Sequence, residues 1–428
     1  MKLRLPRGLR DLDPDEYRRI RYVSGKFQEV AEKYQFPLME PSTIEFLGTL
    51  ELKAGSDIEN EIYAFTDKGG RRLALRFDLT VGLTRYVVSN PQLPKPIKLA
   101  SCSVMWRYDE PQFARYRNFY QWDAEIFGAD PVSAGGEIIA FSEDLLRELG
   151  LREIRTRVSS RKVLESAISE RIRQLDPVEV MRIVDKKERQ GIDVVRELLS
   201  GRGLTEDDVK WLSDLVSIED RPTRARERLA RVDSELVESP DYAQLAQTVE
   251  VAQSFGAQNV SIDLSVVRGI DYYDGVVFET SSAKAPQVGS LLGGGSFTVL
   301  VEALGGNFTA WGAAGGIERT LLALEATGQL GEKEVKRGTY VAYTEADLAP
   351  VASAVTKKLR DFGIASETSL VGRSLSNQLS YAERIGYRNV VIVGRKEWSN
   401  RRVVCKDFES GVQKEIPYQD LPRFLRGD

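Results

Sequence analysis

The chain has 428 residues, of which 42% are hydrophobic, so it is long enough to bury a large core and to form two or three domains. Its formal net charge of −4 excludes a strong overall basic field and confines any nucleic-acid site to a local surface. It has no histidine and only two cysteines, which excludes a His-based catalytic triad and a metal site built on protein His and Cys ligands.

The sequence also predicts where the protein works. No stretch approaches the roughly 18 consecutive apolar residues of a membrane helix, and the opening MKLRLPRGLRDLDPDE has no apolar signal region. Cys102 and Cys405 lie far apart in the chain and suggest no disulfide framework. We therefore expect a cytoplasmic protein without a membrane partner.

The first predicted element is an amphipathic helix over about residues 14–35, where apolar residues recur at helical spacing after an Asp-Pro start signal. The segment FPLMEPSTIEFL, residues 36–47, predicts an extended stretch that two prolines interrupt. Residues 71–90 predict a short strand that passes into a helix near Thr80.

The next two predicted strands, within residues 97–127, form an antiparallel pair whose faces differ in polarity, because successive strand side chains point to opposite faces. The odd positions of the second strand carry Arg115, Arg117, Phe119, Gln121, Asp123, Glu125 and Phe127, whereas the even positions are largely apolar. The pair would gather Arg107, Arg115, Gln121 and Glu125 on one polar surface.

The polar face has two interpretations. The simpler one is a solvated sheet face with cross-strand salt bridges. Three further segments favour a ligand site, since each places charges beside small or aromatic residues: RFDLT at 76–80, VVRGIDYYDG at 266–275 and GGIER at 315–319. Arginines that take bidentate partners suit phosphate oxygens, and planar side chains suit a nucleobase.

The rest of the chain predicts a helix at 134–150, a charged helical module over 151–255 and further strands within 259–280. The glycine cluster GGGSFTVL, residues 293–300, lacks a dinucleotide-binding pattern and is not expected in a strand–turn–helix context, and no phosphate-binding G-x-x-x-x-G-K-[ST] loop is found. After linker-like composition near residue 330, strand and helix patterns alternate and predict a small α/β domain.

Six segments in order resemble the class II aminoacyl-tRNA synthetases and, within them, the histidyl-tRNA synthetase family. The hairpin WRYDEPQFARYRNFYQWDAEIFG resembles motif 2, GGIER resembles motif 3, and LMEPSTIEF resembles the dimer-forming motif 1. RGIDYYDG is similar to the family's histidyl signature, PRGLRDLDPDE to its N-terminal opening, and RSLSNQLSYAERIGYRNVVIVG to its anticodon-binding domain. The match spans essentially the whole chain.

The resemblance implies an α+β catalytic domain over 1–325, in which an antiparallel class II synthetase sheet is flanked by helices and a helical insertion occupies about 160–255. It implies a linker over 326–337 and an α/β anticodon-binding domain over 338–428. A homodimer is implied by motif 1. The implied activity is that of a histidine–tRNA ligase, which activates histidine with ATP and Mg²⁺ and transfers it to tRNA(His).

The resemblance also implies roles for individual residues. For ATP, Arg107 would hold the α-phosphate, Arg319 the γ-phosphate, Arg115 and Arg117 the phosphate tail, and Glu110 the adenine. For the amino acid, Asp78, Thr80 and Gln121 would hold the amino group, Glu125 and Tyr273 would read the ring, and Arg268, Tyr272 and Phe297 would also line the site. Arg107, Arg268 and Gln121 would be the catalytic residues.

One segment departs from the family's pattern. Where the family has Arg-Tyr-Asp after the glycines, this chain has Ser296, Phe297 and Thr298, and a phenylalanine cannot hydrogen-bond the imidazole as the family's tyrosine does. Two alternatives therefore stand beside the ligase: a synthetase-like ligase with altered amino-acid specificity, and a non-catalytic paralogue that resembles the regulatory subunit of ATP phosphoribosyltransferase. The arginine set and the C-terminal domain favour the ligase.

Overall fold

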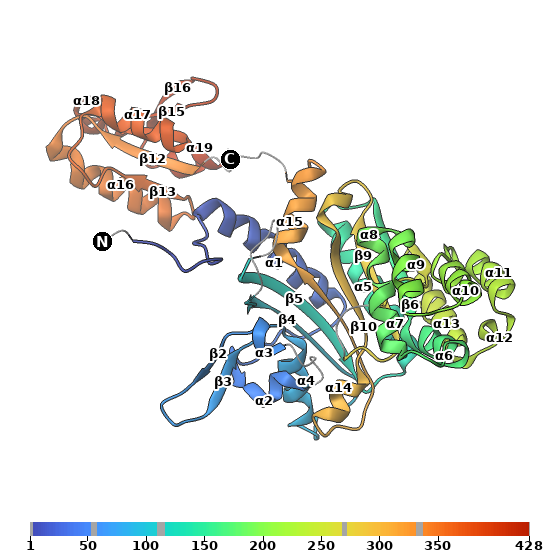
Figure 1. The fold of residues 1–428 in the computed structure, drawn as a ribbon. Coiled ribbons are helices and arrows are strands. Elements are labelled where there is room, and N and C mark those ends of the chain that lie inside the picture. Colours follow the sequence, from blue (N-terminus) through green and yellow to red (C-terminus); the bar gives the residue numbers. More distant parts are fainter. Residues whose placement is uncertain (1–2, 53–57, 109–115, 268–271, 331–336, 428) are drawn as a thin grey trace. The chain divides into compact units, whose positions relative to one another are not determined.

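The structure, a computed structural model, describes residues 3–52, 58–108, 116–267, 272–330 and 337–427 (Figure 1). The chain divides into two units, residues 1–330 and 331–428, each with its own sheet and core. Within these described ranges, no helix is both long and apolar enough to cross a membrane.

The N-terminal helix forms as predicted. Helix α1 (Pro14–Lys33) begins with a capping box, in which the Asp13 side chain accepts hydrogen bonds from the first turn and the Glu16 side chain accepts one from the backbone of Asp13. A proline at the first helical position suits this start because its missing N–H needs no partner there. The apolar stripe of the helix, including Phe27, is buried in the main core.

A small antiparallel sheet follows α1. Its strands lie in the order β1 (Ile44–Phe46), β3 (Arg72–Leu75) and β2 (Ala64–Thr66). The helices of this region are α2 (Leu47–Glu51), α3 (Ile58–Glu61) and α4 (Thr80–Val88). The predicted passage from a strand to a helix near Thr80 is thus confirmed.

The large sheet of the first unit holds eight strands. Their order is β4 (Ile97–Trp106), β5 (Asn118–Phe127), β11 (Ala310–Gly316), β10 (Ser290–Ser296), β9 (Val276–Ser282), β6 (Ile154–Ser160), β8 (Val260–Asp263) and β7 (Glu219–Asp220). Every neighbouring pair is antiparallel except β6 and β8. The predicted antiparallel sheet flanked by helices is confirmed.

Two apolar cores cover the opposite faces of β5, because its side chains alternate. Trp122 points toward α1 and α5 (Pro131–Glu148), where its ring stacks on Phe27 at 5.4 Å between centroids. Phe127 points to the other side and packs edge-on against Phe297 and Phe308. Gln121, Asp123 and Glu125 lie on this second face, so the polar row runs beside an apolar core.

The prediction of a helical module over 151–255 is wrong at its beginning. Residues 154–160 form strand β6, which pairs with β9 and β8 inside the large sheet. The charged composition suggested a helix, but Arg157 of this strand is buried and forms ion pairs with carboxylates of neighbouring elements. Tertiary partners thus allow this charged segment to form a strand.

The remaining module is helical apart from the two-residue strand β7, and its helices gather beside β6 (Figure 1). They are α6 (Arg161–Arg171), α7 (Pro177–Val184), α8 (Lys187–Gln190), α9 (Ile192–Gly201), α10 (Glu206–Val216), α11 (Pro222–Val232), α12 (Ser234–Val237) and α13 (Pro240–Ser254). The last of these packs against α5, where Gly136 leaves no room for a side chain beside Val251.

The context of the glycine cluster also differs from expectation. The short 3₁₀ helix η1 (Pro286–Val288) precedes β10, and β10 passes through Phe297 directly into α14 (Thr298–Ala303), so a strand does lead into a helix there. The glycines serve close packing within the sheet: a Cβ on Gly294 would lie 2.1 Å from the carbonyl oxygen of Gly312 on β11. The neighbouring strands are antiparallel, which separates this arrangement from a dinucleotide-binding βαβ unit.

The C-terminal unit alternates strand and helix as predicted. Its sheet has the order β13 (Ser366–Thr368), β12 (Arg337–Tyr343), β14 (Tyr387–Val393), β15 (Arg402–Asp407) and β16 (Gln413–Pro417), with the first three strands parallel. Its helices are η2 (Ala346–Leu348), α16 (Ala349–Asp361), α17 (Leu375–Ile385), α18 (Arg395–Ser399) and α19 (Leu421–Arg426). The main core of this unit includes Val341, Leu359 and Val391.

Candidate active site

The predicted polar face of β5 is buried rather than solvated. The exposed fractions of Gln121, Asp123 and Glu125 are 6%, 0% and 1%. The interpretation as a solvated salt-bridged face is therefore wrong, because α4, the tyrosines of the 266–275 segment and Phe297 belong to the layer that covers this side of the sheet. Burying three such groups is costly unless they have polar partners.

Asp123 lies at the centre of a hydrogen-bond network. Its Oδ1 accepts a hydrogen bond from Nε2 of Gln121 at 2.9 Å, and its Oδ2 accepts one from the hydroxyl of Thr80 at 3.1 Å. On the far side of Gln121, a guanidinium nitrogen of Arg107 donates to Gln121 Oε1 at 3.4 Å, and Arg107 Nε donates to the carbonyl of Phe77 at 3.0 Å. This chain of contacts joins motif 2 to the first turn of α4.

Asp78 belongs to the same network from the segment that precedes α4. Its Oδ1 accepts from the backbone N–H of Val81 at 3.2 Å, and its Oδ2 accepts from the hydroxyl of Tyr272 at 3.4 Å. The Tyr272 ring packs against Tyr273 and against Phe297. The RFDLT segment, motif 2 and the described part of the RGIDYYDG segment therefore converge, as the sequence predicted.

Glu125 is different, because both of its carboxylate oxygens are buried without a hydrogen-bond partner among the described residues. Glycines border it: Glu125 pairs with Gly312 on β11, which pairs in turn with Gly295 on β10. A Cβ on Gly312 would lie 2.9 Å from Cγ of Glu125 and 3.1 Å from Cε1 of Phe297. A carboxylate held bare beside side-chain-free backbone is suited to a hydrogen-bond donor that arrives with a ligand.

Burial changes the acidity of the whole cluster. It raises the pKa of Asp123 to about 7, with the nearby charge of Asp78 adding to the shift. Burial and the adjacent Asp123 raise the pKa of Glu125 well above its ordinary value, and burial raises that of Asp78. The pKa of Tyr272 rises for the same reason, which keeps its hydroxyl available as a donor. A cationic ligand would relieve this accumulation of negative charge.

Three of the predicted phosphate-binding arginines, Arg107, Arg319 and Arg117, lie within the described residues. Arg107 lies in the network above and its guanidinium also sits over the ring of Phe119. Arg319 lies in the first turn of α15 (Ile317–Ala326) and donates to the carbonyl of Ser290 at 3.1 Å. The Arg117 guanidinium already has protein partners: it donates a hydrogen bond to the carbonyl of Arg7 at 3.1 Å and lies over the ring of Tyr108. These contacts hold it against the N-terminal segment.

Register places Arg319 near the network, because Gln121 on β5 pairs with Gly316, the residue that precedes α15. Three predicted residues, Glu110, Arg115 and Arg268, lie outside the described residues. Across the described ranges, no group of three or more Cys, Asp or Glu side chains is arranged to hold a metal ion.

Asp123 is the residue of this site that the sequence prediction missed. The alternation that selected Gln121 and Glu125 pointed equally to the position between them, so the signal was present in the period of two. The family resemblance assigned roles only to its two neighbours. The structure makes Asp123 the residue that links Gln121 to Thr80.

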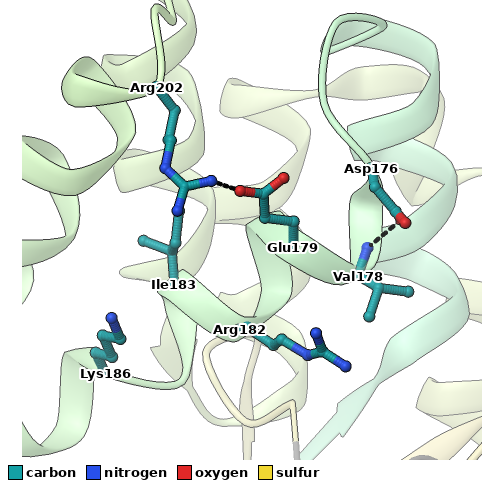
Figure 2. Close-up of a pocket in the computed structure, with 7 residues that line it drawn as sticks. All are labelled: Asp176, Val178, Glu179, Arg182, Ile183, Lys186 and Arg202. Carbon is teal, nitrogen blue, oxygen red and sulfur yellow. Dashed lines mark hydrogen bonds and ion pairs between the residues drawn. The ribbon is translucent and has the colours of Figure 1, made fainter. Parts of the chain in front are cut away.

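A separate hollow of about 520 Å³ lies in the helical module and contains none of the predicted site residues (Figure 2). Its lining is Asp176, Val178, Glu179, Arg182, Ile183, Lys186 and Arg202. The acidic groups are already engaged, because Glu179 pairs with Arg202 and Asp176 accepts from the N–H of Val178 at 2.9 Å. Arg182 and Lys186 add positive charge, which makes this hollow electrostatically unlike the candidate active site.

The antiparallel sheet, together with the described parts of the RFDLT, motif 2 and RGIDYYDG segments, which meet on it, defines the catalytic domain of a class II aminoacyl-tRNA synthetase. Residues 8–320 match the family model described as histidyl-tRNA synthetase, and residues 330–428 match the anticodon binding domain. The chain belongs to the histidyl-tRNA synthetase family, as the sequence motifs predicted.

Individual relatives extend over nearly the whole chain. The histidine–tRNA ligase of Pyrococcus furiosus is 33% identical over 423 residues, which cover 98% of each chain. A crystal structure of histidyl-tRNA synthetase from Nostoc sp. PCC 7120 superposes with a TM-score of 0.84 at 24% identity, over 100% of this chain and 99% of the other. A structure titled ATP phosphoribosyltransferase regulatory subunit/histidyl-tRNA synthetase, from Bacillus halodurans, has a TM-score of 0.77 at 22% identity over 92% of this chain and 99% of the other. These last two likenesses concern the fold.

Proposed function

We propose that the protein is a histidine–tRNA ligase, which uses ATP to form histidyl-adenylate and then transfers the histidyl group to tRNA(His). Family membership supports the reaction, and the observation that carries the choice of amino acid is the bare, buried carboxylate of Glu125. Histidine brings an ammonium group and a ring N–H, and each can donate a hydrogen bond to a buried carboxylate.

In the amino-acid half of the site, the ammonium group would meet Asp78, Thr80 and Gln121, and the imidazole would meet Glu125 and Tyr273. Tyr272 and Phe297 would supply ring surface around it. Asp123 would keep Gln121 and Thr80 oriented. A pocket that hydrogen-bonds the polar atoms of its substrate rejects analogues without those atoms strongly, because its own buried groups would then be unpaired.

In the nucleotide half, a carboxylate oxygen of histidine would attack the α-phosphate while the bond to pyrophosphate breaks in line. Arg107 and Arg268 would stabilise the charge at the α-phosphate, with Gln121 holding the reacting amino acid, and Arg319 would bind the γ-phosphate. Arg115, Arg117 and Glu110 would complete the ATP site. In the second step a ribose hydroxyl of the tRNA would attack the histidyl carbonyl, and AMP would leave.

Mg²⁺ would accompany ATP. The ion would neutralise charge on the phosphates.

The chain would use separate parts for its two substrates. We place the catalytic domain at 1–325, including the helical insertion at about 160–255, a linker at 326–337 and the anticodon-binding domain at 338–428. The division of the chain near residue 330 and the family match over 330–428 support these bounds. The reaction would take place in the cytoplasm, where its tRNA substrate is used.

A homodimer through motif 1 is the proposed assembly. In one chain this segment exposes large apolar side chains: Leu38, Ile44 and Phe46 are 45%, 43% and 56% exposed. Apolar groups gathered in this way favour a protein interface. Light scattering of Phe46→Glu should show a monomer where the unmodified chain shows a dimer, and a dimeric variant would contradict the proposed interface.

Altered amino-acid specificity is the second candidate, and Phe297 is the observation that favours it. The regulatory paralogue has no comparable support, because the chain retains Arg107 and Arg319 and matches the anticodon binding domain.

Amino-acid-dependent pyrophosphate exchange, measured with each of the twenty amino acids, separates the candidates. Exchange that depends on histidine is the expected result. Exchange with another amino acid would establish altered specificity, and no exchange with any amino acid would remove the enzyme interpretation. Glu125→Gln is the matched variant, since it keeps the shape of the side chain but cannot ionise.

A further inference from the structure

The start of α15 is attached to β5 through a buried carboxylate. Glu318, whose side chain is 9% exposed, accepts a bifurcated hydrogen bond from the backbone N–H of Tyr120, with its two carboxylate oxygens 3.0 and 3.1 Å from the nitrogen. Strand β11 ends at Gly316, which pairs with Gln121. It therefore offers no carbonyl to Tyr120, the residue of β5 that precedes Gln121. The Glu318 side chain supplies the acceptor for Tyr120 instead. Glu318 is adjacent in sequence to Arg319, and Tyr120 is adjacent to Gln121, so this contact lies beside both predicted site residues.

Arg10 completes this attachment from the segment that precedes α1. One of its nitrogens lies 3.2 Å from Glu318 Oε1 and another 2.7 Å from Glu16 Oε1. Its guanidinium also lies 3.8 Å from the ring centroid of Tyr116, two residues before β5. Arg10 therefore contacts motif 2, motif 3 and the capping box of α1 with a single side chain.

The neighbouring backbone reinforces this arrangement. Arg117 donates its backbone N–H to the carbonyl of Gly8 and a guanidinium N–H to that of Arg7, both at 3.1 Å. The N-terminal segment thus binds to the residues that lead into β5 at two successive carbonyls. Burial raises the pKa of Glu318, whereas the backbone hydrogen bonds and Arg10 oppose that rise. Removing Arg10 would leave a buried carboxylate without its counter-charge.

We propose that Arg10 and Glu318 are positioning residues for the nucleotide half of the active site: they fix the first turn of α15, and with it Arg319, against β5 beside Gln121. This inference depends on the proposed function in that Arg319 is taken to bind ATP. Neither residue needs to touch the substrate. Their effect should fall on ATP rather than on histidine, because the amino-acid half is held by other contacts, from Asp78, Thr80 and Asp123.

The test uses the full-length chain and two readouts, calorimetric binding of MgATP and the KM values of pyrophosphate exchange. Arg10→Ala should raise the Kd and the KM for ATP by about 10- to 100-fold, the size expected when a remote change misplaces a binding group by about 1 Å. The KM for histidine should change by less than about twofold, as expected for independent sites. Arg10→Lys, which keeps the charge but cannot span both carboxylates, should be intermediate.

Two further variants exclude a general loss of structure. Arg18→Ala removes an exposed pair with Asp15 on α1 and should change ATP binding by less than about twofold. In a Glu318→Gln background, Arg10→Ala should have a much smaller effect than in the unmodified chain, because the charge it neutralises is already gone.

Unchanged ATP binding in Arg10→Ala would overturn the inference, as would equal shifts for ATP and histidine or effects that simply add in the double variant. These results are distinguishable from failure of the proposed function. If the unmodified chain binds MgATP but exchanges with no amino acid, the ligase assignment fails while the calorimetric comparison still decides the role of Arg10. If the unmodified chain binds no MgATP, both are overturned.

Discussion

Two charged clusters lie on the large sheet of the first unit, and each combines one arginine with three carboxylates. In the first, Arg157 lies 2.6 Å from Glu188 and 3.4 Å from both Asp263 and Glu279. In the second, the contacts of Arg107 go to the Phe77 carbonyl and the Gln121 amide, and no described contact joins it to a carboxylate of Asp78, Asp123 or Glu125. In the first cluster the arginine forms ion pairs with the carboxylates, whereas in the second the described contacts of Arg107 are hydrogen bonds to neutral groups.

Both clusters lie on the same face of the sheet, since Glu279 and Asp123 are joined by one cross-strand row through Gly293 and Ala314. They nevertheless differ in their access to water. The Glu188 and Glu279 side chains are 55% and 18% exposed. The three carboxylates of the second cluster are at most 4% exposed. Keeping several carboxylates buried together is expensive, and this cost supports the proposal that the second cluster binds a cationic ligand. The comparison teaches that two clusters with the same groups can differ in ion pairing, and we expect the cluster without ion pairs to be the one that binds a ligand.

The largest expected effect comes from removing a carboxylate of the second cluster. Glu125→Gln should lower histidine-dependent pyrophosphate exchange by about 1,000-fold or more, because the substrate ring loses a charged acceptor within a dry pocket. Thermal unfolding should show no loss of stability, since burial and the adjacent Asp123 disfavour the charged form of Glu125 in the folded protein. A variant that unfolds readily would mean that Glu125 is a structural residue.

The next prediction removes the arginine of the first cluster and concerns stability instead of activity. Arg157→Met should lower the free energy of unfolding by about 3–5 kcal/mol, because it strands the buried Asp263 carboxylate without its counter-charge. Arg155→Met on the same strand is the control: its pair with Glu219 is half exposed and should contribute less than about 1 kcal/mol. Equal losses in denaturant melts of the two variants would show that pairing at Arg157 has no special weight.

The pH dependence of stability sharpens the comparison. The folded-state pKa of Asp123 is raised to about 7, above its ordinary value of 3.8, so folding is favoured while the carboxyl is protonated. Stability from this group is complete below about pH 4 and declines as the pH rises to about 7. Asp123→Asn should flatten part of that decline in melts between pH 4 and 8, and an unchanged slope would contradict a raised pKa for this buried carboxyl.

The smallest expected effect comes from Phe297→Tyr. The ring edge of Phe297 and the side chain of Glu125 approach the same point above Gly312, so a hydroxyl there could hydrogen-bond either the bare carboxylate or the substrate ring. The KM for histidine should fall by roughly 3- to 10-fold, about the net value of one hydrogen bond. A higher KM for histidine with a lower KM for another amino acid would support altered specificity.

Removing residues after 330 tests the division between units instead. The two units have separate cores, so the truncated chain should retain exchange within about threefold. Charging of tRNA should fall by about 100-fold, because the contacts of a whole domain with the nucleic acid are lost. Equal charging by the full and truncated chains would refute the proposed role of the C-terminal unit.

Much of the site could be predicted because its signals are local. Alternation along 115–127 placed Gln121 and Glu125 on one face, and the helix start near Thr80 followed from the pattern of its own segment. The strand at 154–160 could not be predicted in this way, since its charges are acceptable only beside partners from α8, β8 and β9. The position of Arg117 likewise depends on the N-terminal segment, more than a hundred residues away in the chain.

The sequence by itself determined the order of the motifs, the family, and which face of each strand carries the polar groups, because side-chain periodicity is fixed by backbone geometry. Only the tertiary structure decided that the polar face of β5 is buried, that Asp123 connects Gln121 with Thr80, and that Arg157 forms ion pairs with three carboxylates. Burial and pairing depend on which distant segments cover a surface, and charge has its energetic meaning only in that environment.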